Sequence, residues 1–277
     1  MKGSEMAPRG LLFILALLTL ASGQASARSA SPYAISCPTA QVPVVVDGKW
    51  TSRGEWADAS RTPLLRDVGY GTAYFLAKHD GAHLYAMIDF PSDHAMTGSD
   101  AGWIGDEGLL CFDPLNDGGE RPKADDLAIH FFFGSNGLEA SILRGNGIEW
   151  IRGNTSGPIE AAASTDAAND PYSGSPHVIY EFKIPLGIVA NGTAVGFFIS
   201  VADSELSNKM YWPRSLHKSV ASRLMPDEWG ILELSRSPIP EFGSPIPDGP
   251  HIGDRLPEQG DEGPRQWDGA EAAPIIR

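Results

Sequence analysis

The sequence predicts an all-β protein, folded as an antiparallel β-sandwich of the jelly-roll or immunoglobulin-like kind and followed by a disordered C-terminal tail. Short apolar or alternating runs recur between turn signals from residue 32 to residue 236, a spacing typical of sandwiches and closed barrels. The run HVIYEFKI (177–184) alternates with a period of two, which places one face against a core and turns the other toward water. No long segment combines helical periodicity with helix caps.

Nine runs are the expected strands, each separated from the next by turn-forming residues. Between the second and third runs, Asp80-Gly81 is a strong signal for a tight hairpin. The runs are VPVVV (42–46), TAYFLAK (72–78), HLYAMIDF (83–90), GLLCF (108–112), LAIHFFF (127–133), LEASIL (138–143), HVIYEFKI (177–184), AVGFFISVA (194–202) and GILEL (230–234).

The two ends of the chain differ from the middle. Residues 1–27 have the pattern of a signal peptide, because Lys2 and Arg9 precede an apolar run that ends in small residues. That run is too short to span a bilayer, and no later segment is long and apolar enough. Residues 237–277 are rich in Pro, Gly and acidic side chains, a composition that predicts disorder. The sequence therefore predicts an exported protein, extracellular or periplasmic, with one domain over 32–236.

Charge and cysteine content limit the partners. The formal net charge is −14, which repels nucleic acid but suits a divalent cation or a neutral ligand. No partner chain is indicated, and a monomer is expected. Cys37 and Cys111 are the only cysteines, and an even count in an oxidising compartment favours a disulfide. Two buried free thiols remain the alternative, since a sequence does not give the required geometry.

Several motifs occur in an order that resembles a known family. They are VDGKWTSRGEWADA, AYFLAKHDGAHLYAMIDFPSD, GDEGLLCFDPLNDGG, YEFKIPLGIVANGTAVGFFISVADSE, YWPRS and EWGILEL. Together they resemble family 9 carbohydrate-binding modules and their DOMON-like relatives, over about residues 44–234. The resemblance implies a non-catalytic β-sandwich that binds a saccharide through aromatic side chains in loops. It also implies structural calcium, as in some members of that family.

A saccharide site needs an exposed aromatic face with polar neighbours. Trp56 and Trp229 follow Glu beside strand motifs and are assigned to the core, while Trp50 is left open. Among the aromatic residues in loop-like sequence, Trp150 and Trp212 are the leading candidates because polar side chains stand close to them in sequence. The full predicted site comprises Trp103, Trp150, Arg152, Asn154, Tyr172, Asn208, Trp212 and Arg214.

The acidic stretch CFDPLNDGGERPKADDLAIHF (111–131) has two interpretations. As an EF-hand starting at Asp113 it fails, because Leu115 and Ala124 stand where oxygen ligands are needed. An irregular calcium site remains one interpretation, and a metal-free turn rich in Asn, Asp, Gly and Pro is the other. The candidate calcium ligands are Asp113, Asn116, Asp117, Asp125 and Asp126.

Other functions stay open. DOMON-like sandwiches include carriers of b-type haem, and the chain offers axial ligand atoms without a diagnostic spacing. The sequence contains no G-x-S-x-G, H-E-x-x-H, P-loop or C-x-x-C motif, so a glycoside-active enzyme or a purely structural cell-surface domain would have to act without a recognised signature. The haem ligand candidates are Met87, Met210, His94, His130, Lys209 and Lys218.

Overall fold

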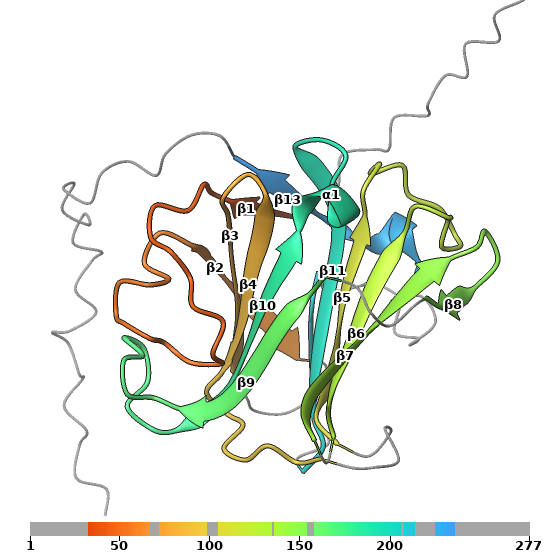
Figure 1. Ribbon diagram of the computed structural model, residues 1–277. Coiled ribbons are helices and arrows are strands. Elements are labelled where there is room, and N and C mark those ends of the chain that lie inside the picture. The colour runs from red at the N-terminus through yellow and green to blue at the C-terminus, as the bar shows by residue number, and fades with distance from the viewer. Residues whose placement is uncertain are drawn as a thin grey trace, which may run out of the picture. The chain divides into compact units, whose positions relative to one another are not determined.

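The computed structural model describes residues 33–66, 72–98, 105–134, 136–153, 158–205, 208–213 and 225–235 (Figure 1). The predicted signal peptide and the predicted disordered tail lie outside these residues and stay predictions. Strands make up most of the regular structure, so the all-β prediction is confirmed. Within the described ranges, short helical turns occur at α1 (Leu186–Val189) and η2 (Pro226–Glu228), and neither has the length and apolar character needed to cross a membrane.

The strand bounds follow the chain. They are β1 (Ala34–Cys37), β2 (Ser60–Arg66), β3 (Ala73–His79), β4 (His83–Phe90), β5 (Glu107–Asp113), β6 (Leu127–Gly134), β7 (Gly137–Gly145), β8 (Trp150–Arg152), β9 (Glu160–Asp166), β10 (His177–Pro185), β11 (Ala194–Asp203), β12 (Asn208–Trp212) and β13 (Gly230–Leu234).

The strands form one antiparallel path in the order β8-β7-β6-β5-β11-β12-β2-β3-β4-β10-β9. Strand β13 pairs with β11 beside β12, and β1 pairs with β13 in parallel. The path curls so that β3, β4 and β10 face β5, β6 and β11 (Figure 1). The main core lies between these two halves and includes Phe75, Phe131 and Phe197. This arrangement is the predicted sandwich.

The outward face of β10 differs from its prediction. Val178, Tyr180, Phe182 and Ile184 point into the main core as their alternation predicts. The other face was expected to meet water, yet Ile179 and Glu181 on it are buried as well. Residues 41–59 cover this face, where an outer cluster forms from Trp50, Trp56, Leu76, Met87 and Ile179.

The covering segment replaces the first predicted strand. VPVVV (42–46) forms no strand, because buried side chains satisfy its backbone. The amide of Val45 donates to Glu55 at 2.8 Å, and the carbonyl of Val42 accepts from the Lys78 ammonium at 2.9 Å. Lys78 also pairs with Asp58 at 2.7 Å. Without a strand partner, these groups would be costly to bury unless side chains bonded to them.

Glu181 explains the opening motif VDGKW…EW. One of its carboxylate oxygens accepts the amides of Asp47 and Gly48 at 2.9 and 2.8 Å, and the other accepts the Trp56 indole N–H at 2.9 Å. Gly48 has φ of 77° and lies against the backbone of Ala163 with no room for a Cβ atom. The motif thus anchors the covering segment to the outer face of the sheet.

The predicted disulfide is wrong, because Cys37 and Cys111 are both buried free thiols. Strands β13 and β11 lie between β1 and β5. Neighbouring strands are about 4.8 Å apart, so β1 and β5 are roughly 14 Å apart, whereas a disulfide needs Cα atoms within about 7 Å. Burial raises the pKa of both thiols. The alternative of two buried thiols is the one that the fold realises.

Candidate functional site

The two leading aromatic candidates, Trp212 and Trp150, lie in different parts of the fold. Trp212 is only 7% exposed and belongs to the main core, with its ring 6.1 Å from that of Phe197. It packs so closely on Gly230 that a Cβ atom there would clash. Because β12 alternates, Met210 and Trp212 both face inward. The prediction that Trp212 stacks on a saccharide is therefore wrong.

Trp150 lies on the outer face of the half of the sandwich that contains β5, β6 and β11. Its ring stacks on Trp229 with centroids 6.2 Å apart and an interplanar angle of 15°. Both rings belong to a second outer cluster with Cys111, Ala128, Phe198 and Tyr211. Arg152 follows on the same short strand and is exposed. Trp150 is thus half-buried by aromatic packing, and it does not share a site with Trp212.

Four of the predicted site residues are not placed with their side chains. Trp103, Asn154 and Arg214 lie outside the described residues, and Asn208 is placed only as the first residue of β12. Their roles stay predictions. Trp56 and Trp229 are buried, as predicted.

Among the predicted aromatic residues that the structure describes, Tyr172 is the most exposed. It is 56% exposed and lies in the loop between β9 and β10. The guanidinium carbon of Arg61 lies 3.9 Å from its ring centroid and 3.3 Å from that of Tyr74. Trp50 meets the Tyr172 ring edge-on at 5.9 Å. The Arg61 guanidinium thus lies against one face of the Tyr172 ring and also contacts the Tyr74 ring, an arrangement that cation–π attraction stabilises.

Arg61 keeps its hydrogen-bonding capacity. Its side chain is 24% exposed, and its nearest carboxylate is Asp89, with Nη2 and Oδ2 3.9 Å apart. That separation is too long for a hydrogen bond, and the buried Nε has no partner among the described residues. Five N–H donors on a guanidinium normally find acceptors. Among the described residues, Nε of Arg61 therefore has no acceptor, and the partly exposed guanidinium lies beside an exposed tyrosine.

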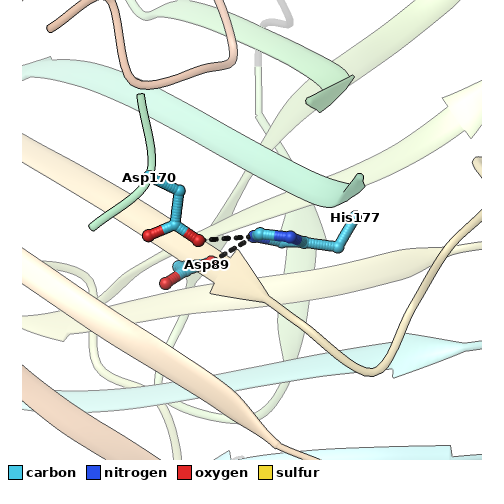
Figure 2. A group of neighbouring side chains, drawn as sticks. All are labelled: Asp89, Asp170 and His177. Atoms are coloured by element: carbon cyan, nitrogen blue, oxygen red, sulfur yellow. Dashed lines mark hydrogen bonds and ion pairs between the residues drawn. The ribbon is translucent and has the colours of Figure 1, made fainter. Parts of the chain in front are cut away.

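Beneath this pair lies a buried group that we call the histidine cluster, made of Asp89, Asp170 and His177 (Figure 2). Nε2 of His177 lies 2.6 Å from Asp89 and 3.5 Å from Asp170. Burial alone would lower the pKa of His177, but the hydrogen bonds to Asp89 and Ser175 and the charges of both carboxylates raise it overall. Burial raises the pKa of Asp170.

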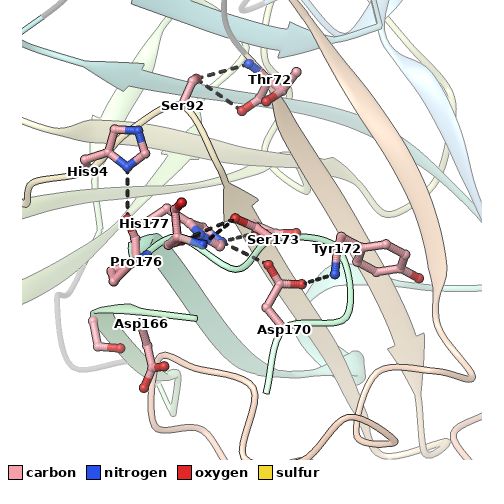
Figure 3. A network of polar contacts seen from close by, with 12 residues as sticks. Thr72, Ser92, His94, Asp166, Asp170, Tyr172, Ser173, Pro176 and His177 are labelled. Carbon is pink, nitrogen blue, oxygen red and sulfur yellow. Dashed lines mark hydrogen bonds and ion pairs between the residues drawn. The ribbon is translucent and has the colours of Figure 1, made fainter. Parts of the chain in front are cut away.

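The histidine cluster also holds the loop that carries Tyr172. Asp170 accepts the amide of Tyr172 at 2.8 Å (Figure 3). One residue earlier, the Asn169 side chain donates to the carbonyls of Trp50 and Thr51, each at 3.0 Å. The loop is thereby joined both to the sheet below it and to the covering segment beside it. These contacts fix where the tyrosine ring stands.

A second buried group, the acidic cluster, comprises Asp93, Asp106 and Asp203. These residues lie beyond the end of β4, before β5 and at the end of β11. Asp106 accepts the amides of Thr97 and Ser204 at 2.7 and 3.0 Å. Among the described residues, neither Asp93 nor Asp106 pairs with a Lys, Arg or His.

The acidic cluster perturbs its own members. Burial, followed by the charge of Asp106, raises the pKa of Asp93 to about 7. Oδ2 of Asp93 and the hydroxyl of Tyr180 are buried with no hydrogen-bond partner among the described residues. Sequence reasoning missed this group. Each aspartate borders an apolar run, which was the available signal. Strand pairing brings the start of β5 to the end of β11, and only the curling of the sheet brings the end of β4 beside them.

The predicted calcium loop combines features of both interpretations. Ligand atoms of Asp113, Asp117 and Asp125 lie within 4.8 Å of one another, as a metal site requires. Yet Asp113 already accepts the amide of Gly118 at 2.8 Å, and Lys123 pairs with Asp117 at 2.8 Å. These bonds are those of a turn that carries its own cation.

The remaining two predicted ligands lie in the same loop. Asn116 has φ of 49°, a turn conformation that asparagine tolerates. Asp126 is buried with Oδ1 unpartnered, and burial raises its pKa to about 7, with the charge of Asp113 contributing. Calcium at this loop therefore stays a prediction.

The haem ligand candidates are scattered. Met87 lies in the outer cluster and Met210 in the main core, so they do not form an axial pair. His94 is exposed and bonds to the carbonyl of Pro176 at 2.9 Å, and His130 lies 3.2 Å from Glu107. Lys209 is in β12 beside β11, and Lys218 lies outside the described residues.

Known proteins were compared with this chain by sequence and by structure. No protein-family model matches the sequence, and no curated protein matches it. A family 9 carbohydrate-binding module from Caldicellulosiruptor kristjanssonii, solved in complex with cellotriose, is similar with a TM-score of 0.52 and 16% identity, over 79% of this chain and 100% of the module. The structure of such a module from the same organism in complex with glucose has a TM-score of 0.52 and 16% identity, over 76% of this chain and 100% of the module. The chain therefore has the fold of family 9 carbohydrate-binding modules, as its motifs predicted.

Proposed function

We propose that this protein is a secreted, non-catalytic carbohydrate-binding module that recognises a neutral saccharide at Tyr172. The observation that carries the proposal is the exposed tyrosine ring, supported by Arg61 and Trp50, on a fold shared with a module solved with cellotriose and glucose. Export rests on the predicted signal peptide at residues 1–27.

Tyr172 suits a sugar because pyranose rings present flat patches of C–H bonds. Such patches stack on aromatic faces, and removing their apolar area from water contributes roughly 25 cal/mol per Å². A platform also has to be rigid, since immobilising a free side chain on binding costs about 0.5–1.5 kcal/mol. The contacts of Tyr172 with Arg61 and Trp50 already limit its motion.

Arg61 supplies the polar part of the site. Sugar hydroxyls and ring oxygens accept hydrogen bonds, and the guanidinium of Arg61, whose side chain is 24% exposed, is a hydrogen-bond donor beside the tyrosine ring. Polyanionic glycans are disfavoured because the chain carries a formal net charge of −14. A neutral saccharide is therefore the better match for this tyrosine and arginine.

The test is a calorimetric titration of the purified protein with glucose, cello-oligosaccharides and other neutral saccharides. Tyr172→Ala is expected to weaken the tightest interaction at least tenfold, while Trp150→Ala, whose ring packs on Trp229, leaves it unchanged. Trp103→Ala tests whether that predicted residue also contacts the saccharide, in which case the affinity should fall. Equal affinity of wild type and Tyr172→Ala would refute this site.

We also propose that calcium braces the sandwich at the acidic cluster. Calcium prefers several oxygen ligands, and Asp93, Asp106 and Asp203 bring three buried carboxylates together. The loop around Asp117 has Lys123 as a resident cation, so the deeper cluster is the stronger candidate. Calcium titration should show tight uptake that Asp93→Asn weakens and Asp117→Asn does not. The opposite pattern would favour the ligands predicted from sequence.

A further inference from the structure

We propose that the histidine cluster is a binding site for a transition-metal ion, Zn²⁺ in the first instance, separate from both the saccharide site and the calcium site. Asp89, Asp170 and His177 come from β4, from the loop after β9 and from the start of β10 (Figure 2). All three side chains are fully buried, and one ligand atom from each lies within 4.8 Å of the others.

The imidazole is oriented as in metal sites. Nδ1 of His177 lies 2.8 Å from the carbonyl oxygen of Ser175. A carbonyl only accepts hydrogen bonds, so Nδ1 carries a proton and Nε2 is the nitrogen left for another partner. Metal-binding histidines commonly donate their second N–H to a backbone carbonyl in this way, which fixes the tautomer. Here Nε2 points at two carboxylates.

Unpartnered oxygens complete the site. Oδ2 of Asp89 and Oδ2 of Asp170 are both buried and have no hydrogen-bond partner among the described residues. The 3.5 Å from Nε2 to Oδ2 of Asp170 matches the edge of a tetrahedron, which is about 3.4 Å for ligands about 2.1 Å from zinc. Oδ1 of Asp89 is at hydrogen-bond distance instead, 2.6 Å. Asp89 would therefore bind the ion through its free Oδ2.

The donor set distinguishes this site from the acidic cluster. Imidazole nitrogen suits zinc and other first-row transition metals, whereas an all-oxygen set suits calcium. The ion takes the place of the proton that otherwise bridges Nε2 and Asp89, and that proton leaves to solvent. Arg61 of β2 is the other charged group facing Asp89, with Nη2 3.9 Å away. Three protein ligands leave a fourth position for water.

Metal binding would reinforce the loop that carries Tyr172. Asp170 would hold the ion through Oδ2, while its other oxygen, Oδ1, holds the amide of Tyr172. The ion would thus join that loop to β4. Since the ligands are buried, entry of the ion requires a local opening of the fold, so each addition has to be followed to equilibrium.

The experiment uses the full chain, stripped with a chelator and titrated with zinc chloride by calorimetry, and with cobalt chloride by visible absorption. Calcium is kept in excess to occupy oxygen-only sites. We expect one zinc per chain and a cobalt band typical of nitrogen and oxygen ligands. His177→Gln should weaken uptake at least tenfold. His94→Gln is the matched control. His94 is an exposed histidine whose Nδ1 bonds to the carbonyl of Pro176, the residue before His177.

Further measurements keep the test decisive. If His177→Gln does not fold, Asp170→Asn retains the acceptor for the Tyr172 amide and should show the same loss. In the wild type, the ¹⁵N resonance of the His177 Nε2 atom should shift on zinc addition. Tyr172→Ala should bind zinc normally, which separates this proposal from the saccharide site. Absence of saturable zinc uptake, or uptake unchanged in both cluster variants, would overturn it.

Discussion

The histidine cluster and the acidic cluster have similar burial, but the first contains cationic partners for its carboxylates and the second consists of three aspartates. Asp89 and Asp93 stand four residues apart near the end of β4, and both are almost completely buried. Asp89 has His177 and Arg61 as cationic partners, whereas burial and then the charge of Asp106 raise the pKa of Asp93 to about 7. The contrast shows that burial alone does not determine what a carboxylate does. The charged groups around a buried carboxylate decide whether its ionised form is stabilised within the protein, as at Asp89, or disfavoured, as at Asp93.

The largest expected effect comes from removing the charge that balances the histidine cluster. Asp89→Asn removes the carboxylate 2.6 Å from the buried imidazole of His177 and leaves Asp170, 3.5 Å away, as its remaining acidic partner. Breaking one partner of a buried ion pair typically costs about 3–5 kcal/mol, and we expect a loss of that size in the free energy of unfolding. Urea unfolding at pH 7 measures it. A loss below about 1 kcal/mol would mean that the cluster is not an ion pair.

An aspartate-to-asparagine substitution in the acidic cluster should increase the free energy of unfolding instead of lowering it. Asp93→Asn removes a carboxylate that burial and Asp106 disfavour, and the new side chain retains an acceptor for the amide of Ala95. In chelator at pH 8 we expect the free energy of unfolding to rise by about 1–2 kcal/mol. Calcium should reverse the order by stabilising wild type more than the variant. Destabilisation in chelator would contradict the absence of a countercharge.

The pH dependence of stability follows from the same groups. Burial raises the pKa values of Asp93, Asp126 and Glu181 to about 7, so between about pH 4 and pH 7 the folded chain keeps protons that the unfolded chain releases. Unfolding therefore becomes easier as pH rises through this window. The raised pKa of His177 acts in the same direction, because its protonated form is bonded in the folded state.

Urea midpoints in chelator from pH 5 to pH 8 would show this decline. Asp93→Asn should flatten the slope by its own share and leave that of Glu181, which belongs to neither cluster. Midpoints that rise with pH in the wild type would show that these carboxylates are ionised in the folded chain throughout.

The smallest expected effect is at Tyr180. Its hydroxyl is buried near the acidic cluster without a hydrogen-bond partner among the described residues. Removing an unsatisfied polar group while keeping the shape is nearly neutral, so Tyr180→Phe should change the free energy of unfolding by less than about 1 kcal/mol. Thermal unfolding in chelator measures this. A larger loss would reveal a partner for the hydroxyl, such as bound water.

Local sequence patterns predicted much of the fold. HVIYEFKI alternates correctly into the core because a pleated strand forces a two-residue period. VPVVV has the composition of a strand but covers the sheet instead, because Lys78, Glu55 and Asp58 satisfy its backbone from other segments. Composition cannot reveal such distant partners. The unpaired cysteines have the same explanation, since strand order sets their separation.

The candidate site was less predictable. Tyr172 was identified from its loop-like surroundings, but its support by Arg61 comes from a residue more than 100 positions earlier. Trp212 has similarly polar neighbours in sequence, yet the alternation of β12 turns it into the core. Asp89 and His177 lie within apolar strand motifs and meet only because β4 and β10 pair. Long-range pairing therefore builds the site, and sequence spacing does not encode it directly.

The most direct test of saccharide recognition at Tyr172 is an NMR titration of the ¹⁵N-labelled protein with the neutral saccharide that binds most tightly in the calorimetric panel. The largest shifts are predicted at the backbone amides of Asp170, Tyr172 and Ser173 and at the Arg61 guanidinium, and Tyr172→Ala should abolish them. Shifts centred on the Trp150 indole, or no binding by any saccharide in the panel, would contradict the account.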